Sequence, residues 1–473
     1  MNASRRAFLS AASGLAVAGL GRAAPLAMNL AGLGALAAGQ AQAANTSDGY
    51  KALVCLYMSG GNDSHNWVVP MDATNYASYA SARTDLAVPL NKLLALSTTG
   101  QAAGRAFGMP QELAPLQRRY EQGQCAVVAN VGTLVRPITK AEFTAGGAGV
   151  PAKLFSHNDQ ASMWQSLKTE GAPSGWGGRM GDALMSANQQ PVFTAVGASG
   201  NAVFLAGSKV TPYYIGSGGV VQINAAQDGW HAGSAAVPGA LRSMLNASTS
   251  PNDFQAEYIK VAQRSLNTTT ALQAAITAGG VAALPTAPIA LPNGSNLILA
   301  NESIAKQLRI VAQMISAGPA LGMKRQVFMV NISGFDSHAF QMRDQPLQMA
   351  RVAQSVDWFL NTLQALGMMS NVTLFTASDF GRTLLSNGDG SDHGWGSHHF
   401  VVGGAVKGKQ ILGNFPVTAL GTDDDIGSGR LLPSIGVTQL ASSLAGWMGL
   451  SATEQQVVLP NLSSFNAGPS LFA

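Results

Sequence analysis

The stretch ALVCLYMSGGND, residues 52–63, determines the fold class expected of this chain. Its first seven residues are all apolar, without the alternation of a strand that has one wet face, so they predict a strand covered on both faces. Five further short runs are of the same kind and lie at 125–131, 191–196, 327–332, 372–377 and 400–402. Together they predict a central sheet buried between two layers.

Helical patterns separate several of these runs. Residues 343–366 place apolar side chains on one face and are followed by Gly367, a typical helix C-cap. Residues 301–317 and 253–278 are also predicted helices. Because strands and helices alternate, the crossovers should be right-handed and the strands parallel. The predicted fold class is therefore α/β, with a doubly wound, largely parallel sheet sandwiched by helices.

The middle of the chain has a different composition. Residues 197–293 are rich in Ala, Gly, Ser, Thr and Asn, and they end in a proline-containing segment that predicts a loop. We interpret this region as an insertion or cap. The remaining strands and helices then form one domain that spans residues 44–473.

The first 43 residues have the features of a targeting segment. Arg5 and Arg6 precede an apolar stretch with Arg22 as its only charge, and the AQA at 41–43 is a small-x-small cleavage pattern. We interpret residues 1–43 as a twin-arginine signal peptide; an ordinary Sec signal or a membrane helix fits less well, because glycines and glutamines make a poor span. The chain should meet the twin-arginine translocase, become periplasmic or secreted, and keep no stable membrane anchor.

Charge and cysteine content exclude several classes of function. The chain carries 28 basic and 24 acidic residues, and three of the arginines belong to the predicted signal, so the rest is nearly neutral. No nucleic acid partner is expected from such a balance. Cys55 and Cys125 lie in strand-like runs and are interpreted as small buried residues, with one disulfide between neighbouring strands as the alternative.

Acidic and imidazole side chains follow the predicted strands or shortly precede the last one. Since the carboxyl ends of parallel strands meet at one edge of a sheet, these side chains should gather there. Such groups are ligands for a divalent metal, Zn²⁺, Mg²⁺, Mn²⁺ or Ca²⁺, although a turn cap or an ion pair explains any single one equally well. The candidate metal ligands are Asp63, Asp336, His338, Asp379, His393 and His398.

Two further positions are candidates for catalysis. Ser156, in Ser156-His157-Asn158-Asp159, opens a predicted helix, where backbone N–H groups favour an alkoxide or a bound phosphate; a plain capping box is the alternative. Arg382 follows Asp379 by three residues and is a candidate bidentate clamp for an oxyanion, or else an ion-pair partner of Asp379.

These motifs resemble the bacterial family called domain of unknown function 1501. The resemblance is carried by the first strand with its Gly-Gly-Asn-Asp, and by Leu-Phe-Ser-His at 154–157, Gly-Phe-Asp-Ser-His at 334–338, Ser-Asp-Phe-Gly-Arg-Thr at 378–383 and Asp-His-Gly at 392–394. It extends from about residue 52 to the C-terminus and is weakest through the insertion.

That family looks like a distant branch of the alkaline phosphatase and sulfatase superfamily. The resemblance implies an alkaline phosphatase-like sandwich in which Asp63, Ser156, Asp336 with His338, Asp379, and His393 or His398 follow the superfamily order. One departure is that Phe380 stands where the superfamily has a histidine ligand. His157 or His399 could compensate, or one metal could be lost.

The leading hypothesis is an exported, metal-dependent hydrolase of phosphate or sulfate esters on small molecules or polymers. Ser156 would be the nucleophile, Arg382 and His157 would assist, and the metal would hold the ester oxygens. The alternative is a non-catalytic periplasmic binding or assembly protein. The geometric expectation is that Asp336, Asp379 and His338 surround one point, with Asp63 and His393 or His398 lining the same cavity and with Ser156 and Arg382 at its rim.

Overall fold

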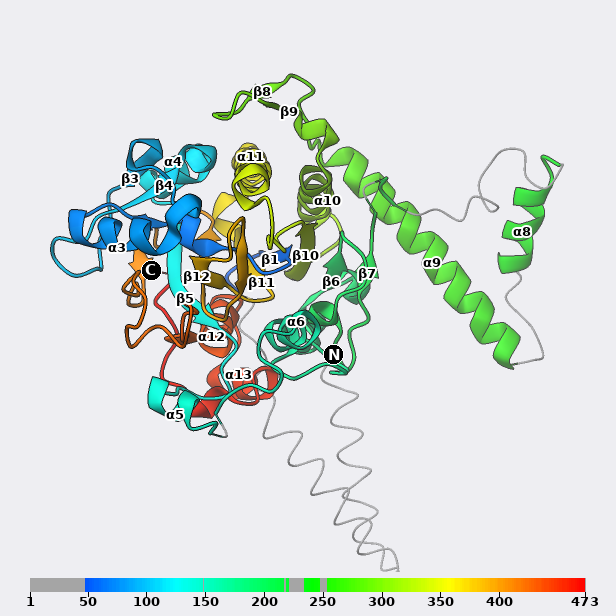
Figure 1. The fold of residues 1–473 in the computed structure, drawn as a ribbon. Helices are drawn as coiled ribbons and strands as arrows, with labels where there is room; N and C mark the ends of the chain where they lie inside the picture. Colours follow the sequence, from blue (N-terminus) through cyan, green and yellow to red (C-terminus); the bar gives the residue numbers. More distant parts are fainter. Residues whose placement is uncertain (1–46, 148, 217, 221–233, 247–252, 473) are drawn as a thin grey trace, which may run out of the picture.

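The computed structural model describes residues 47–472 apart from 148, 217, 221–233 and 247–252 (Figure 1). The predicted signal peptide and His231 therefore lie outside the described residues. Within the described part of the chain, no helix combines the length and the apolar character needed to cross a membrane.

A nine-stranded sheet forms the centre of the fold, in the order β15-β5-β14-β11-β1-β10-β6-β7, with β16 also paired to β5. Strand β1 contains the apolar run at 52–58, and it is parallel to β10 on one side and to β11 on the other. The strands are β1 (Lys51–Ser59), β5 (Cys125–Gly132), β6 (Ala195–Gly197), β7 (Tyr213–Tyr214), β10 (Arg325–Ser333), β11 (Val372–Ser378), β14 (Ser397–Val402), β15 (Ile411–Leu412) and β16 (Ile435–Gly436).

The prediction of an α/β fold with a largely parallel sheet is confirmed, with β14 as the exception. This strand is antiparallel to both β11 and β5. Only the hairpin of β12 (Arg382–Ser386) and β13 (Ser391–His393) separates β11 from β14, and a parallel return would need a longer crossover. The start of β14 consequently lies at the same edge of the sheet as the end of β11.

The strand predicted at 191–196 is largely wrong. Pro191–Phe193 is a 3-10 turn, and only Ala195–Gly197 pairs with β10. Proline has no N–H to donate to a strand ladder, which explains why pairing starts after it.

Helices cover both faces of the sheet. Alternate residues of β1 point to opposite faces, and since residues 52–58 are all apolar, both faces are buried. Val54 and Leu56 pack with helices α4, α10 and α11, whereas Leu53 and Tyr57 pack with α6, α7, α12 and α13. Figure 1 shows the sheet between these two layers. The helices are α3 (Ala73–Arg83), α4 (Ala114–Glu121), α5 (Lys140–Thr144), α6 (His157–Ser166), α7 (Trp176–Leu184), α8 (Val237–Asn246), α9 (Asp253–Ala278), α10 (Ser303–Ala317), α11 (Gln341–Ala365), α12 (Val437–Trp447) and α13 (Ala452–Val458).

The region interpreted as an insertion contributes both to the sheet and to an outer arm. Strand β7 pairs with β6 at the sheet edge. Helix α9 has the predicted bounds and runs outward from the body, with α8 near its outer part (Figure 1). Near its C-terminal end, Leu272 and Ile276 of α9 are buried in the core that includes α10. Two small sheets, β2 (Val69–Pro70), β4 (Phe107–Pro110) and β3 (Leu93–Leu96), and β8 (Ile289–Ala290) with β9 (Asn296–Leu297), complete the fold.

The two cysteines are free and buried. Cys55 packs in the cluster on one face of the sheet and Cys125 in the cluster on the other face. Their interpretation as small buried residues is confirmed, and the alternative of a disulfide is excluded by this placement.

Candidate metal centre

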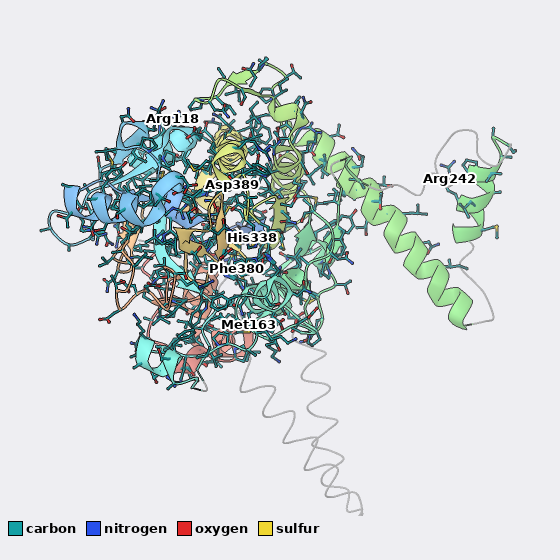
Figure 2. The ribbon with its side chains drawn as sticks, viewed as in Figure 1. Arg118, Met163, Arg242, His338, Phe380 and Asp389 are labelled. Atoms are coloured by element: carbon teal, nitrogen blue, oxygen red, sulfur yellow. The ribbon has the colours of Figure 1, made fainter. Side chains whose placement is uncertain are left out.

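Three imidazoles and one carboxylate meet at the carboxyl edge of the sheet. Asp336 follows β10, His157 opens α6, and His393 ends the β12–β13 hairpin, where it pairs in register with Arg382. One ligand atom from each of His157, Asp336 and His393 lies within 4.8 Å of the others. His338 joins the group, because its Nε2 lies 3.3 Å from Asp336 Oδ1. Figure 2 labels His338 and Phe380.

The hydrogen bonds of His157 and His393 fix which ring nitrogen carries the proton. His157 Nδ1 lies 2.7 Å from the carboxylate of Asp379, and His393 Nδ1 lies 2.8 Å from the carbonyl oxygen of Phe155. Both partners only accept, so each Nδ1 must donate, and in the neutral form of each ring the Nε2 keeps the lone pair. These two Nε2 atoms are each 3.5 Å from Asp336.

His338 extends the same arrangement. Its Nδ1 lies 3.3 Å from Asp392 Oδ1, and its Nε2 lies 2.9 Å from Nε2 of His393. The Asn387 amide donates to Asp392 and helps to hold the pKa of that carboxyl below its usual value, so Asp392 accepts from His338. At this distance the lone pairs of two unprotonated imidazole nitrogens repel each other. A metal ion bound by both nitrogens, or a proton shared between them, removes that repulsion.

Neutral imidazole is the expected state of His393 at neutral pH. Burial lowers its pKa most, the carbonyl of Phe155 opposes this, and the charge of Arg382, together with that of any proton bound by His157 or His338, lowers it further. Asp336 is half-exposed, and the burial it has works to raise its pKa; the hydrogen bond and charge of Arg382 outweigh that effect and hold the pKa below its usual value. His393 therefore offers a neutral nitrogen donor, and Asp336 offers an ionised oxygen donor.

Asp379 is not part of this centre; it contacts the centre through His157. Its Oδ2 accepts from His157 Nδ1 and from the backbone N–H of Gly60. The side chain is 7% exposed, and its Oδ1 has no hydrogen-bond partner among the described residues. A carboxylate that orients a ligating histidine is a common support of metal sites. Asp336 and Asp379 thus share an edge as expected, but they meet through His157.

Phe380 packs against the imidazoles that form the centre. Its ring centroid lies 4.8 Å from that of His157 and 4.6 Å from that of His393. Gly61 has a φ of +80°, and a Cβ there would lie 2.3 Å from the Phe380 ring. Phe380 thus supports the two rings from behind, and His157 supplies a nitrogen to the group. Trp395, in contrast, donates to the Thr133 carbonyl and packs elsewhere, against Phe143.

Arg382 cannot act as a free oxyanion clamp in this conformation. It is fully buried, and its donors go to the carbonyls of Gly60, Gly61 and Ser391 and to the carboxylate of Asp336. Arg382 does form an ion pair, as the alternative interpretation expected, but its partner is Asp336 and not Asp379. The guanidinium ties the loop after β1 to the loop after β10.

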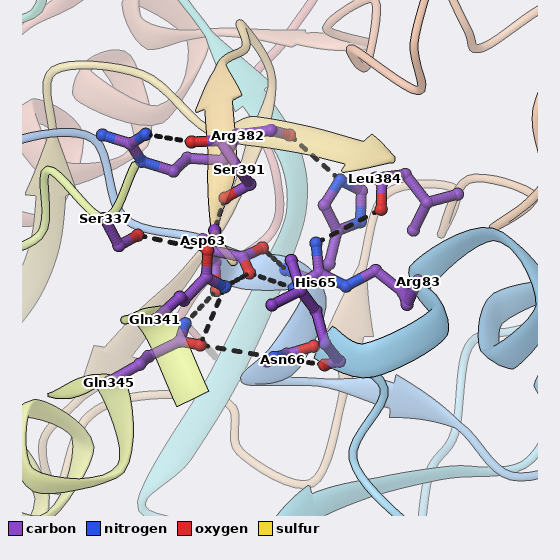
Figure 3. A network of polar contacts seen from close by, with 12 residues as sticks. Asp63, His65, Asn66, Arg83, Ser337, Gln341, Gln345, Arg382, Leu384 and Ser391 are labelled. Atoms are coloured by element: carbon purple, nitrogen blue, oxygen red, sulfur yellow. Dashed lines mark hydrogen bonds and ion pairs between the residues drawn. The ribbon is translucent and has the colours of Figure 1, made fainter. Parts of the chain in front are cut away.

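Asp63 was predicted as a ligand, and the structure places its carboxylate in a different group. Its Oδ1 accepts from the backbone of His65, while Oδ2 is taken by Arg83 and Gln341 in a fully buried network (Figure 3). The network continues from Gln341 through Ser391, whose carbonyl receives Arg382. Asp63 therefore supports the loop that carries Arg382 and has no lone pair directed at the centre.

His398 also lies outside the centre. It is buried, its Nδ1 accepts from the backbone N–H of Asn130, and its ring stacks on Phe415. Burial lowers its pKa far below the usual value. His399 is buried against Trp164, and burial lowers its pKa to about 3. His398 and His399 are successive residues of β14, so their side chains point into the two cores on opposite faces of the sheet. Of His393 and His398, the two alternatives for the last ligand, only His393 therefore lies at the centre.

Ser156 sits directly before His157 at the N-terminus of α6. Its side chain makes no capping hydrogen bond to the helix backbone, so a plain capping box is not formed. Its Oγ instead donates to the buried Asp159, at 3.0 Å. Phe155, just before it, has a φ of +72°, a costly conformation that directs its carbonyl to His393.

A cavity of about 320 Å³ adjoins the centre, and its wall includes His157 and Asp379. The other polar lining residues come from β1, β10, α6 and the segment after β6. The sequence prediction missed all of these, since Asn, Gln and Ser have no spacing signature of their own. The hydroxyl and amide side chains in the wall are Tyr57, Ser59, Asn158, Gln165, Ser199, Asn201 and Asn331.

Comparisons with known proteins give a family and distant structural likenesses. The lipoteichoic acid synthase LtaP from Listeria monocytogenes has a TM-score of 0.32 and 8% identity, covering 86% of this chain and 76% of LtaP. Ps i-CgsB has a TM-score of 0.34 and 12% identity, covering 88% and 77%. BT1596, a 2-O GAG sulfatase, has a TM-score of 0.29 and 12% identity, covering 84% and 74%. Similarity at this level assigns no activity.

No curated protein matches this chain. Residues 50–429, in contrast, match the family described as "Protein of unknown function (DUF1501)". This span contains every residue of the centre and the supporting residues Asp379, Phe380 and Arg382. The chain belongs to the DUF1501 family.

Proposed function

We propose that this protein is a divalent-metal-dependent hydrolase of phosphate or sulfate esters. One observation carries the proposal: the Nε2 lone pairs of His157, His338 and His393 converge with Asp336, and each opposite Nδ1 is tied to an acceptor. The ester class rests on the resemblance of the motifs to the alkaline phosphatase and sulfatase superfamily.

The donor set fits a transition-metal ion better than the other candidates. His157 Nε2 is buried without a hydrogen-bond partner among the described residues, as expected of a nitrogen kept for a metal. Three imidazoles with one carboxylate suit Zn²⁺, whereas Mg²⁺, Mn²⁺ and Ca²⁺ prefer oxygen-rich sites. His157, His338, His393 and Asp336 would hold the ion, which when bound would supply a Lewis acid for the charge on the ester oxygens.

Ser156 is the proposed nucleophile. Its hydroxyl donates to Asp159, and a hydroxyl held by a proton acceptor is the usual form of an activated serine. In the proposed reaction the Ser156 proton passes to Asp159 as the Ser156 oxygen bonds to phosphorus or sulfur, the substrate's ester bond breaks, and the departing oxygen takes up a proton and leaves as the alcohol. Water then cleaves the bond to the Ser156 oxygen, which releases phosphate or sulfate and restores the serine hydroxyl. Phe380 and Asp379 keep His157 in place throughout.

Hydrolysis of 4-nitrophenyl phosphate and 4-nitrophenyl sulfate tests the proposal. Ser156→Ala should lower the rate of the active substrate by at least about a thousandfold, since covalent catalysis loses its acceptor oxygen. Ser162→Ala, on the same helix, is the matched control and should keep the wild-type rate. Full activity of Ser156→Ala would remove the serine from the mechanism.

A non-catalytic binding protein is the second candidate. The observation that favours it concerns cations: four of the five N–H groups of Arg382 already have protein acceptors, and among the described residues neither Lys nor Arg lines the adjoining cavity. A protein that holds its metal but cleaves neither aryl ester would favour this candidate.

We also propose export by the twin-arginine route, followed by residence in the periplasm or secretion. The support is the Arg5-Arg6 pair and the AQA pattern at 41–43. Replacing both arginines by lysine should keep the precursor in the cytoplasm. Normal amounts of processed protein in the periplasm would contradict this route.

A further inference from the structure

The cavity beside the metal centre has a wall of unusual chemistry. It is formed where the ends of β1 and β10, helix α6 and the segment 199–203 meet, and its volume is about 320 Å³. Ligand cavities usually begin near this size. His157 and Asp379 belong to its wall, so a molecule that fills it lies directly against the residues that support the centre.

Neutral donors and acceptors dominate the wall. Asn158, Ser199 and Asn201 make no side-chain hydrogen bond with any described residue. The Asn331 Oδ1 accepts from Ser59, while its Nδ2 donates to none of the described residues. Amides and hydroxyls of this kind offer both donors and acceptors, and each hydroxyl of a polyol can use both at once.

The single carboxylate in the wall argues against an anionic occupant, and the amides argue against an apolar one. Asp379 is the one carboxylate in the lining, and no Lys or Arg is present there to offset a second negative charge. An apolar ligand would leave the amides that it covers without partners, which lowers affinity. Asp379 Oδ2 already accepts from His157 and Gly60, and its Oδ1, which has no partner among the described residues, can accept from a hydroxyl of the occupant without a cation being needed.

We propose that this cavity binds the neutral, hydroxyl-bearing part of the substrate, a sugar ring of a saccharide ester. The ester group itself would lie at the His157–Asp336 side, and the sugar hydroxyls would pair with Asn201, Asn331 and Gln165. The assignment as part of a substrate rests on the proposed function, but the binding of the sugar does not require turnover.

Saturation-transfer NMR with the methyl glycosides of glucose, galactose and mannose tests the inference on the mature chain. At least one glycoside should bind, and Asn201→Ala and Asn331→Asp should each weaken that binding about tenfold, the effect of losing about one hydrogen bond. Asn91→Ala, an exposed amide far from the cavity lining, is the matched control and should bind as the wild type does.

Metal content measured on the same samples separates the two claims. A metal-loaded protein that binds none of the three glycosides, or that binds them equally well in both cavity variants, overturns the sugar assignment and leaves the metal centre standing. A protein that binds a glycoside in this cavity but holds no metal overturns the proposed hydrolase and leaves the sugar assignment standing.

Discussion

At Gly60 the chain brings three parts of the site into contact. Its N–H donates to Asp379, its carbonyl accepts from Arg382, and its Cα lies against the backbone that leads into Asp336. A Cβ at this position would lie 2.4 Å from the Asp336 nitrogen, and the φ is +117°. Only glycine can satisfy both conditions, so the loop after β1 is fixed by the absence of a side chain.

Gly60→Ala should therefore destabilise the fold by about 3 kcal/mol or more, since strain and overpacking add. Gly104→Ala is the matched control: its φ is +84°, but no atom lies within 4 Å of the added Cβ, so it should cost only about 1–2 kcal/mol. Urea unfolding measures both. Equal losses in the two variants would show that the contact with Asp336 does not constrain this loop.

Residue types at the site were predictable from the sequence, but their partners were not. Acids and imidazoles after strand ends identified Asp336, His338 and His393 correctly as neighbours. The spacing could not show that Arg83 and Gln341 occupy Asp63, or that Arg382 pairs with Asp336. Such pairings depend on side-chain directions between segments 20 to 278 residues apart, which no local pattern encodes.

At the scale of elements, the hydrophobic pattern identified the strands, and the hairpin between β11 and β14 determined the direction of β14. The runs that became β1, β5, β10 and β11 were all predicted within two residues of their bounds. The direction of β14 depended on a hairpin of only a few residues, Arg382–Ser386 with Ser391–His393, which carries His393 back over Arg382. That hairpin had no apolar pattern of its own and was not predicted.

The sheet also separates the two thiols. Cys55 and Cys125 lie on opposite faces, and burial raises the pKa of both far above the usual value. An aromatic disulfide reagent should react with neither thiol in the native protein and with two thiols per chain after unfolding without reductant. Fewer than two reactive thiols in the unfolded chain would reveal a disulfide and contradict this arrangement.

For the whole molecule, buried histidines make stability depend on pH. Burial lowers the pKa of His65 to about 4 and that of His399 to about 3. The unfolded chain, with a pKa near 6.5 at these positions, binds more protons below that pH. Their stabilisation is therefore complete above about pH 6.5 and is lost progressively as the pH falls.

The free energy of unfolding, measured in EDTA, should fall by about 2 kcal/mol for each buried histidine between pH 7 and pH 5. His399→Gln should reduce this pH dependence by its share, because glutamine does not titrate. The same free energy at both pH values in the wild type would mean that water reaches these imidazoles.

The central claim is that the cluster at the sheet edge holds a divalent metal ion through His157, His338, His393 and Asp336. Asp379→Asn should weaken metal binding by about 10–100-fold, since the amide can donate to His157 and reverse its tautomer. His398→Gln removes an imidazole from the same stretch of sequence but from outside the cluster, and it should leave the metal content unchanged.

Metal content by mass spectrometry, on the mature protein and its variants, tests this claim most directly. The account predicts one equivalent of Zn²⁺ in the wild type and in His398→Gln, and almost none in folded His393→Ala or His157→Ala. A wild type without metal after loading with Zn²⁺, or a His393→Ala protein that keeps its full equivalent, would contradict it.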